Sequence, residues 1–263
     1  MLLGLVGTAG ADPKPGSIAQ RIEDCEDLPE DAKTRYEAIG KNAVYGVAPS
    51  GEKVLVFPPH EGRDCEVFPM KKVAAKASGA FGTGAEVVAF QGPECGGGNC
   101  MIALAVGPKD GKPAAALSTH TSCDVSVGLA PIKLFNGRDS IELVCRNGGG
   151  AGWKERRMLI DAAGGALASL YGVDTGSYIA LSPEEKKQPG ACPSRPVGSI
   201  RVEKVGDKPL LRVVDPSAGT LKDGKGMLPA RQLGYDPKKR SFTPTGAPDI
   251  PTKVDARADC SKP

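Results

Sequence analysis

Short runs of β-prone apolar residues alternate with clusters of turn-forming residues from about residue 42 onward. The runs 43–47 and 53–57 flank Pro49-Ser50-Gly51-Glu52, a pattern typical of a β-hairpin. Similar turn clusters stand beside β-prone runs further along the chain, so repeated hairpins predict an antiparallel meander. These clusters are residues 108–111, 136–137, 162–165, 205–207 and 235–238.

The hairpins predict a mainly β fold, with a β-rich domain over residues 42–242. Such a meander can bury one face by closing as a sandwich, a barrel or a small propeller, and no repeat is regular enough to choose the propeller. Residues 183–196 read as an exposed connection, which would allow a sub-division of the domain there. Lys71–Ala77 is expected to be a short helix. Residues 243–263 form a Pro-rich tail, expected to run over the surface.

A short helical segment is predicted before the sheet, over residues 12–41. Ile18, Ile22 and Cys25 fall on one face of a first helix. A second helix is expected from Ala32 to Ile39, because a glycine that can close a helix follows directly.

Residues 1–11 resemble the remnant of a secretory signal peptide. An apolar stretch is followed by Ala9 and Ala11, at the −3 and −1 positions of a cleavage site before Asp12. The alternative is a flexible initial tail, because no charged region precedes the apolar stretch. No later run approaches the ~18 apolar residues of a transmembrane helix. The pattern predicts an exported protein, secreted or periplasmic, with no transmembrane segment.

Eight cysteines support export, because an even number of cysteines in an exported chain favours disulfide bonds. Cys95 and Cys100 flank a glycine-rich loop between two strand-like runs, so a disulfide could pin a hairpin base there. Cys123 and Cys145 lie in or beside two further strand candidates and could be joined across one sheet. The remaining pairings are Cys25 with Cys65 and Cys192 with Cys260.

Zinc binding is the competing chemistry for some of these cysteines. Cys95, Cys100, His120 and Cys123 form a Cys-x4-Cys followed by a His-x2-Cys, which could supply four ligands. Such a site needs a reducing compartment, and it would make the chain an intracellular zinc-binding protein. Structural zinc sites more often use tight Cys-x2-Cys pairs, so the spacing favours disulfides.

The segment 118–123, Ser-Thr-His-Thr-Ser-Cys, resembles the nucleophile segment of peptidoglycan L,D-transpeptidases. Those enzymes carry Ser-His-Gly-Cys followed by a hydrophobic residue and an arginine. Here two residues separate His120 from Cys123, and Asp124 follows. The resemblance implies a cell-envelope cysteine enzyme in which His120 activates Cys123. Residues three apart on a strand point to opposite faces, and a disulfide at Cys123 would remove the nucleophile, so the disulfide is favoured.

Charge and composition point away from several other classes. The net charge is +3, from 34 basic and 31 acidic residues, and the basic runs are short and scattered, so we expect no nucleic acid partner. Aromatic residues make up 5% of the chain, with one Trp, which gives no support to carbohydrate binding. Gly148–Gly152 lacks the residues of a phosphate loop and reads as a hairpin turn, so no cofactor is expected.

These features together predict an exported, disulfide-bonded, mainly β protein without catalytic activity. We expect it to serve as a binding or envelope-associated module, with an unknown protein or envelope component as its partner.

Overall fold

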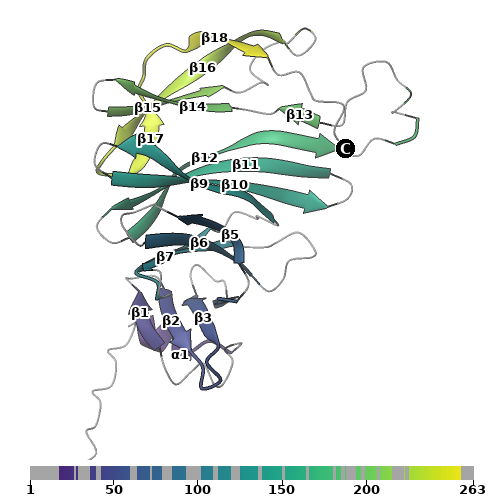
Figure 1. The fold of residues 1–263 in the computed structure, drawn as a ribbon. Coiled ribbons are helices and arrows are strands. Elements are labelled where there is room, and N and C mark those ends of the chain that lie inside the picture. The colour runs from purple at the N-terminus through teal and green to yellow at the C-terminus, as the bar shows by residue number, and fades with distance from the viewer. Residues whose placement is uncertain are drawn as a thin grey trace, which may run out of the picture.

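Antiparallel sheets that follow one another along the chain form the fold of this computed structural model (Figure 1). Four sheets, here called A to D in chain order, contain the strands of the described residues. Each sheet is built mainly from strands consecutive in sequence, as the predicted meander requires. The structure describes residues 18–26, 28, 36–39, 43–59, 64–71, 73–78, 85–92, 102–108, 112–119, 125–135, 138–149, 152–163, 166–179, 182–184, 187, 194–196, 199–205, 208–214, 222 and 225–255.

Sheets A and B each contain four strands in chain order. Sheet A consists of β1 (Tyr36–Ile39), β2 (Ala43–Val47), β3 (Lys53–Phe57) and β4 (Glu66–Pro69). Sheet B consists of β5 (Val73–Ser78), β6 (Ala85–Gln91), β7 (Ile102–Pro108) and β8 (Ala115–Thr119). The helix α1 (Ile18–Glu23) precedes both sheets, within the predicted helical segment.

Sheets C and D contain the longest strands of the fold. Sheet C consists of β9 (Val125–Phe135), β10 (Arg138–Gly149), β11 (Gly152–Ala163), β12 (Ala166–Ile179) and β13 (Ser194–Pro196). Sheet D consists of β14 (Ser199–Val205), β15 (Lys208–Val214), β16 (Lys225–Asp236), β17 (Ser241–Pro244) and β18 (Ile250–Asp255). Both β17 and β18 pair with β16, so part of the Pro-rich tail belongs to sheet D.

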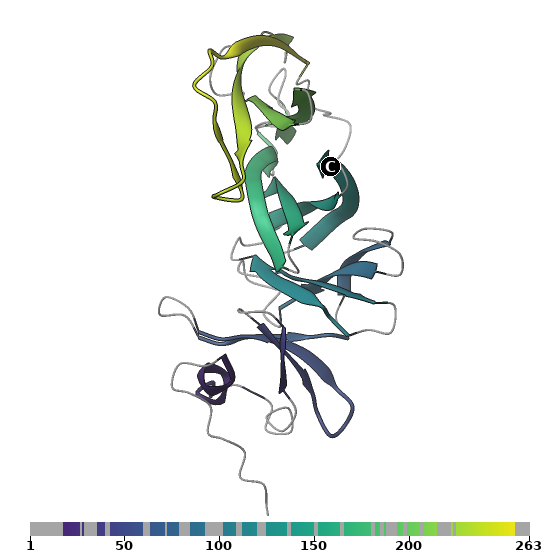
Figure 2. The same cartoon turned by 90° about the vertical axis from the view of Figure 1, so that its left-hand side faces the viewer.

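The sheets stack in chain order, so that each one packs against the next (Figure 2). Separate apolar clusters fill the A–B, B–C and C–D interfaces. A further cluster joins α1 to the outer face of sheet A. The buried residues therefore form successive layers between sheets.

Burial on both faces explains why the strands of sheet B are almost continuously apolar. In β6, Val87 and Ala89 pack towards sheet C, whereas Val88 and Phe90 pack towards sheet A. Neighbouring side chains on a strand point to opposite faces, so both sets must be apolar when both faces are covered.

The turns lie where their residue types predict them. The β2–β3 hairpin closes at residues 48–52, where Gly51 has a φ of 82° and its amide donates to the carbonyl of Ala48 over 2.8 Å. A left-handed φ is readily adopted by glycine, which accounts for that residue in the turn. Gly149 pairs directly with Gly152, so the glycine-rich segment is the β10–β11 hairpin turn.

The mainly β, antiparallel fold predicted from the sequence is confirmed, and among the closures left open no closed barrel is found in the described strands, which lie in separate stacked sheets. Two predicted helices require correction. The predicted helix Ala32–Ile39 is wrong at its end, because Tyr36–Ile39 form β1 and Ile39 is buried in the A–B interface. Lys71–Ala77 is not a helix either, since residues 73–78 form β5 and pair with β6. Packing between sheets outweighs the local preference of alanine for helix in that segment.

Candidate functional site

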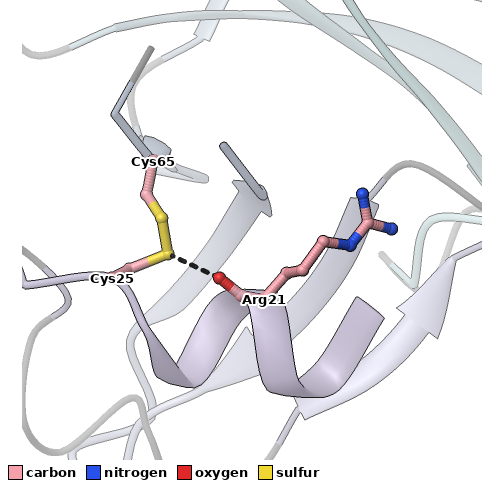
Figure 3. The surroundings of a disulfide bond; sticks show 3 residues. All are labelled: Arg21, Cys25 and Cys65. Atoms are coloured by element: carbon pink, nitrogen blue, oxygen red, sulfur yellow. Dashed lines mark hydrogen bonds between the residues drawn. A yellow bond between two sulfur atoms is a disulfide. The ribbon is translucent and has the colours of Figure 1, made fainter. Parts of the chain in front are cut away.

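The disulfide bond between Cys25, just after α1, and Cys65, just before β4, ties the helical segment to sheet A (Figure 3). It is one of the pairs predicted from the sequence, and its Cα atoms lie 5.7 Å apart. Cys25 is buried together with Ile22, which packs on the outer face of sheet A. The Sγ atom of Cys25 lies 3.6 Å from the carbonyl oxygen of Arg21. A disulfide sulfur has no proton to donate, so this is a packing contact at the end of α1.

Cys145 is the other cysteine that the structure describes. It is disulfide-bonded and buried in the B–C interface. The described part of the chain contains no free cysteine. The other cysteines of the predicted pairs, zinc set and nucleophile pair lie outside the described residues, so those assignments stay predictions. They are Cys95, Cys100, Cys123, Cys192 and Cys260, together with His120.

Ser118, at the start of the transpeptidase-like segment, contacts a carboxylate that the sequence analysis missed. Its hydroxyl donates a hydrogen bond to Oε2 of Glu66, which is 8% exposed. Glu66 belongs to β4 and Ser118 to β8, so the bond connects sheets A and B. The only sign of this contact in the sequence was a single acidic residue, Glu66, beside the apolar residues of β4. Because burying a carboxylate is costly without hydrogen-bond donors, we assign this pair a role in joining the two sheets.

A second buried polar pair lies in sheet C. Ser140 and Asp161 are both fully buried and directly opposite one another on β10 and β11, with 3.3 Å between the serine Oγ and Oδ1 of the aspartate. Asp161 lies near the end of β11. The two polar side chains are buried in sheet C among side chains that are otherwise mostly apolar.

Charged side chains form cross-strand pairs on sheet C near the β10–β11 hairpin. The pairs are Arg157–Glu142 and Arg146–Glu155 at 3.4 Å each, and Arg156–Asp174 at 3.4 Å. Their side chains are 24–45% exposed, so each pair contributes only about 0–1 kcal/mol. Arg156 and Arg157 are neighbours on β11, so the pairs lie on both faces of sheet C, and we interpret them as solvated, charge-balanced contacts.

Tyr171 packs at the C–D interface, near Arg156. Burial raises the pKa of its hydroxyl above 10.0, and the positive charges of Arg231 and Arg156 partly oppose that rise. Burial also raises the pKa of Tyr36, which packs beside α1. In both cases the fold favours the neutral phenol.

A pocket of about 250 Å³ opens at the junction of sheets A and B. In sheet B, Lys76 lies opposite Val88, and Val88 lies opposite Ala105 on the next strand. The small side chain of Ala105 leaves a depression at this row. The full lining is Lys53, Met70, Val73, Lys76, Glu86, Val88, Phe90, Ala105, Gly107 and Pro113.

The rim of this pocket, here called the A–B pocket, carries more positive than negative charge. Lys76 pairs with Glu86 at 3.9 Å, whereas Lys53 is exposed and has no carboxylate partner in the described part of the chain. Val73, also on the rim, is 40% exposed, which is unusual for a large apolar side chain in this structure. The A–B pocket thus combines an apolar floor with an available ammonium group.

No protein-family model, curated protein or solved structure matches this chain. We therefore infer its function from the geometry of its own residues. The described residues contain no group of three His, Cys, Asp or Glu side chains placed to hold a metal ion. None of the helices in the described ranges has the length and apolar character needed to cross a membrane.

Proposed function

We propose that this protein is an exported, disulfide-bonded binding module, secreted or periplasmic and without catalytic activity. The observation that carries the proposal is the Cys25–Cys65 disulfide. Stable disulfides form in oxidising compartments outside the cytosol, because cytosolic reductants keep most thiols reduced. The disulfide joins elements at the two ends of a 40-residue separation and is packed into the fold, which is typical of a structural bond.

A binding role is supported by the A–B pocket and by the rigid way in which its walls are held. Its lining comes from strands of two sheets, with the pair Ser118–Glu66 connecting those sheets. Sites built on packed strands keep their shape better than sites on loops. The partner of the module, an unidentified protein or envelope component, belongs to this proposal as an expectation.

The thiol state of protein isolated from its natural host tests the proposal. Cells are lysed in N-ethylmaleimide without reductant, the protein is digested with trypsin, and the peptides are identified by mass. We expect a crosslinked pair of peptides 22–33 and 64–71, and peptide 139–146 unlabelled and crosslinked through Cys145 to a second cysteine peptide. Fractionation of the same cells should place the protein outside the cytosol.

The same digest separates the proposal from its competitors. Labelling of Cys25, Cys65 and Cys145 by N-ethylmaleimide would contradict an oxidised, exported protein. Cys123 lies in peptide 110–133, so a label there would reveal the free thiol that a cysteine enzyme requires. Disulfide links at Cys123 would instead exclude that enzyme, and links at Cys95 and Cys100 would exclude the zinc set.

A further inference from the structure

The A–B pocket is the cavity whose shape and charge indicate a ligand most directly. Its floor is formed by Val88, Phe90 and Ala105, which belong to the apolar A–B layer. An apolar floor with a few polar groups at its edge is the usual composition of a small-molecule site. At about 250 Å³ the cavity is smaller than the ~300–1,000 Å³ of sites for drug-sized ligands, so it suits a small molecule or one end of a longer one.

The charges at the rim favour an anion. The ammonium of Lys76 is balanced by the carboxylate of Glu86 at 3.9 Å, which leaves Lys53 as an additional positive charge. Lys53 is the first residue of β3 and projects from sheet A, on the opposite wall from Glu86 in sheet B. No described carboxylate neutralises the ammonium of Lys53. An anionic group of a ligand near Lys53 would therefore be attracted to it.

We propose that the A–B pocket binds a short apolar carboxylate, with its hydrocarbon part on the floor and its carboxylate beside Lys53. Val73, which is 40% exposed, lines the same pocket, so the hydrocarbon part of the ligand would contact it. The proposal rests on the proposed binding function and names its ligand class. A short-chain acid and a long-chain fatty acid, whose chain end would extend beyond the pocket, share this chemistry.

Titration calorimetry of the oxidised full-length protein with sodium octanoate at neutral pH tests this proposal. We expect saturable binding at one site, weakened about tenfold by Lys53→Glu, since reversing a nearby charge acts on the carboxylate directly. Lys208→Glu is the matched control, because Lys208 is an exposed strand residue of sheet D. The octanoate affinity of this variant should stay within about twofold of that of the wild type. Octan-1-ol, which lacks the charge, should bind more weakly than octanoate.

A second variant tests the floor independently of the rim. Val88→Phe adds bulk at a partly buried position of the pocket and should abolish binding, with its thermal unfolding checked by circular dichroism. A chain-length series from butyrate to dodecanoate distinguishes the two sources. Affinity that peaks at a short chain indicates a short-chain acid, whereas affinity that rises through dodecanoate indicates a long-chain fatty acid.

Three results would overturn the ligand assignment: no saturable octanoate binding, equal losses in Lys53→Glu and Lys208→Glu, or octanol binding as tight as octanoate. None of them depends on the thiol state. A crosslinked peptide map with no octanoate binding would therefore refute the ligand and leave the exported module intact. Free thiols with octanoate binding would do the reverse.

Discussion

Removal of the Cys25–Cys65 disulfide should loosen sheet A more than the rest of the stack. The strands β1, β2 and β3 all lie within the 40-residue separation that the disulfide closes. Closing a loop of that length lowers the entropy of the unfolded chain and stabilises the fold by about 4 kcal/mol at 25 °C. Replacing both cysteines by alanine avoids leaving a lone thiol in the apolar cluster beside α1.

Native-state hydrogen exchange is the assay that locates this loss. In the double variant, the opening free energy of amides in β2 and β3 should fall by about 4 kcal/mol, which corresponds to exchange roughly a thousandfold faster. Amides of β15 and β16 lie in sheet D, outside the closed loop, and provide an internal reference. They should change much less than those of sheet A.

Ile22→Ala with the disulfide intact is the matched control. Ile22 is fully buried against sheet A, so its truncation should cost about 2–5 kcal/mol through lost packing. It would leave the loop entropy unchanged, so it reports what lost packing alone does to exchange in sheet A. Unchanged exchange in sheet A of the cysteine variant, or an equal loss in sheets A and D, would refute the reasoning.

The other predictions concern packing, backbone space and pH. Leu104→Ala, at a fully buried position, should lower the free energy of unfolding by about 2–5 kcal/mol in urea titrations, whereas Met227→Ala, at 58% exposure, should change it by less than ~0.5 kcal/mol. Gly107→Ala should lower the melting temperature, because its Cβ would lie 2.4 Å from a backbone oxygen; Gly128→Ala, whose nearest contact is 3.7 Å, should not. Because burial raises the pKa of Tyr171, the unfolded chain loses that proton first above pH 10.0, so stability should fall there. Tyr171→Phe should lessen that fall when unfolding is compared at about pH 9 and pH 11.

The sequence predicts the strands and hairpins well because each one is specified locally. The turn at Pro49–Glu52 and the glycines before Trp153 lie where their residue types require. The stacking of sheets was missed because it depends on contacts between distant segments. An apolar run such as 85–91 shows burial but does not say which surfaces cover its two faces.

The A–B pocket was missed for a related reason. Lys53, Lys76 and Glu86 look like ordinary surface charges of strand ends, and only the pairing of β5, β6 and β7 places two of them beside the same apolar row. Cys25 and Cys65 were paired only as a remainder, since nothing local connects them. The structure brings them together through the packing of α1 on sheet A.

Because the sheets stack in chain order, each sheet is synthesised before the sheet that covers it. The nascent chain therefore exposes one apolar sheet face during translation. Once β7 has emerged, the Val87, Ala89 and Leu104 side chains of sheet B lack their cover until β10 and β11 have been made. At ~5–20 residues per second, the stretch from Pro108 to Ala163 takes roughly 3–11 s. During that interval the apolar face of sheet B is exposed on the growing chain. It can bind other proteins until sheet C has been made and covers it.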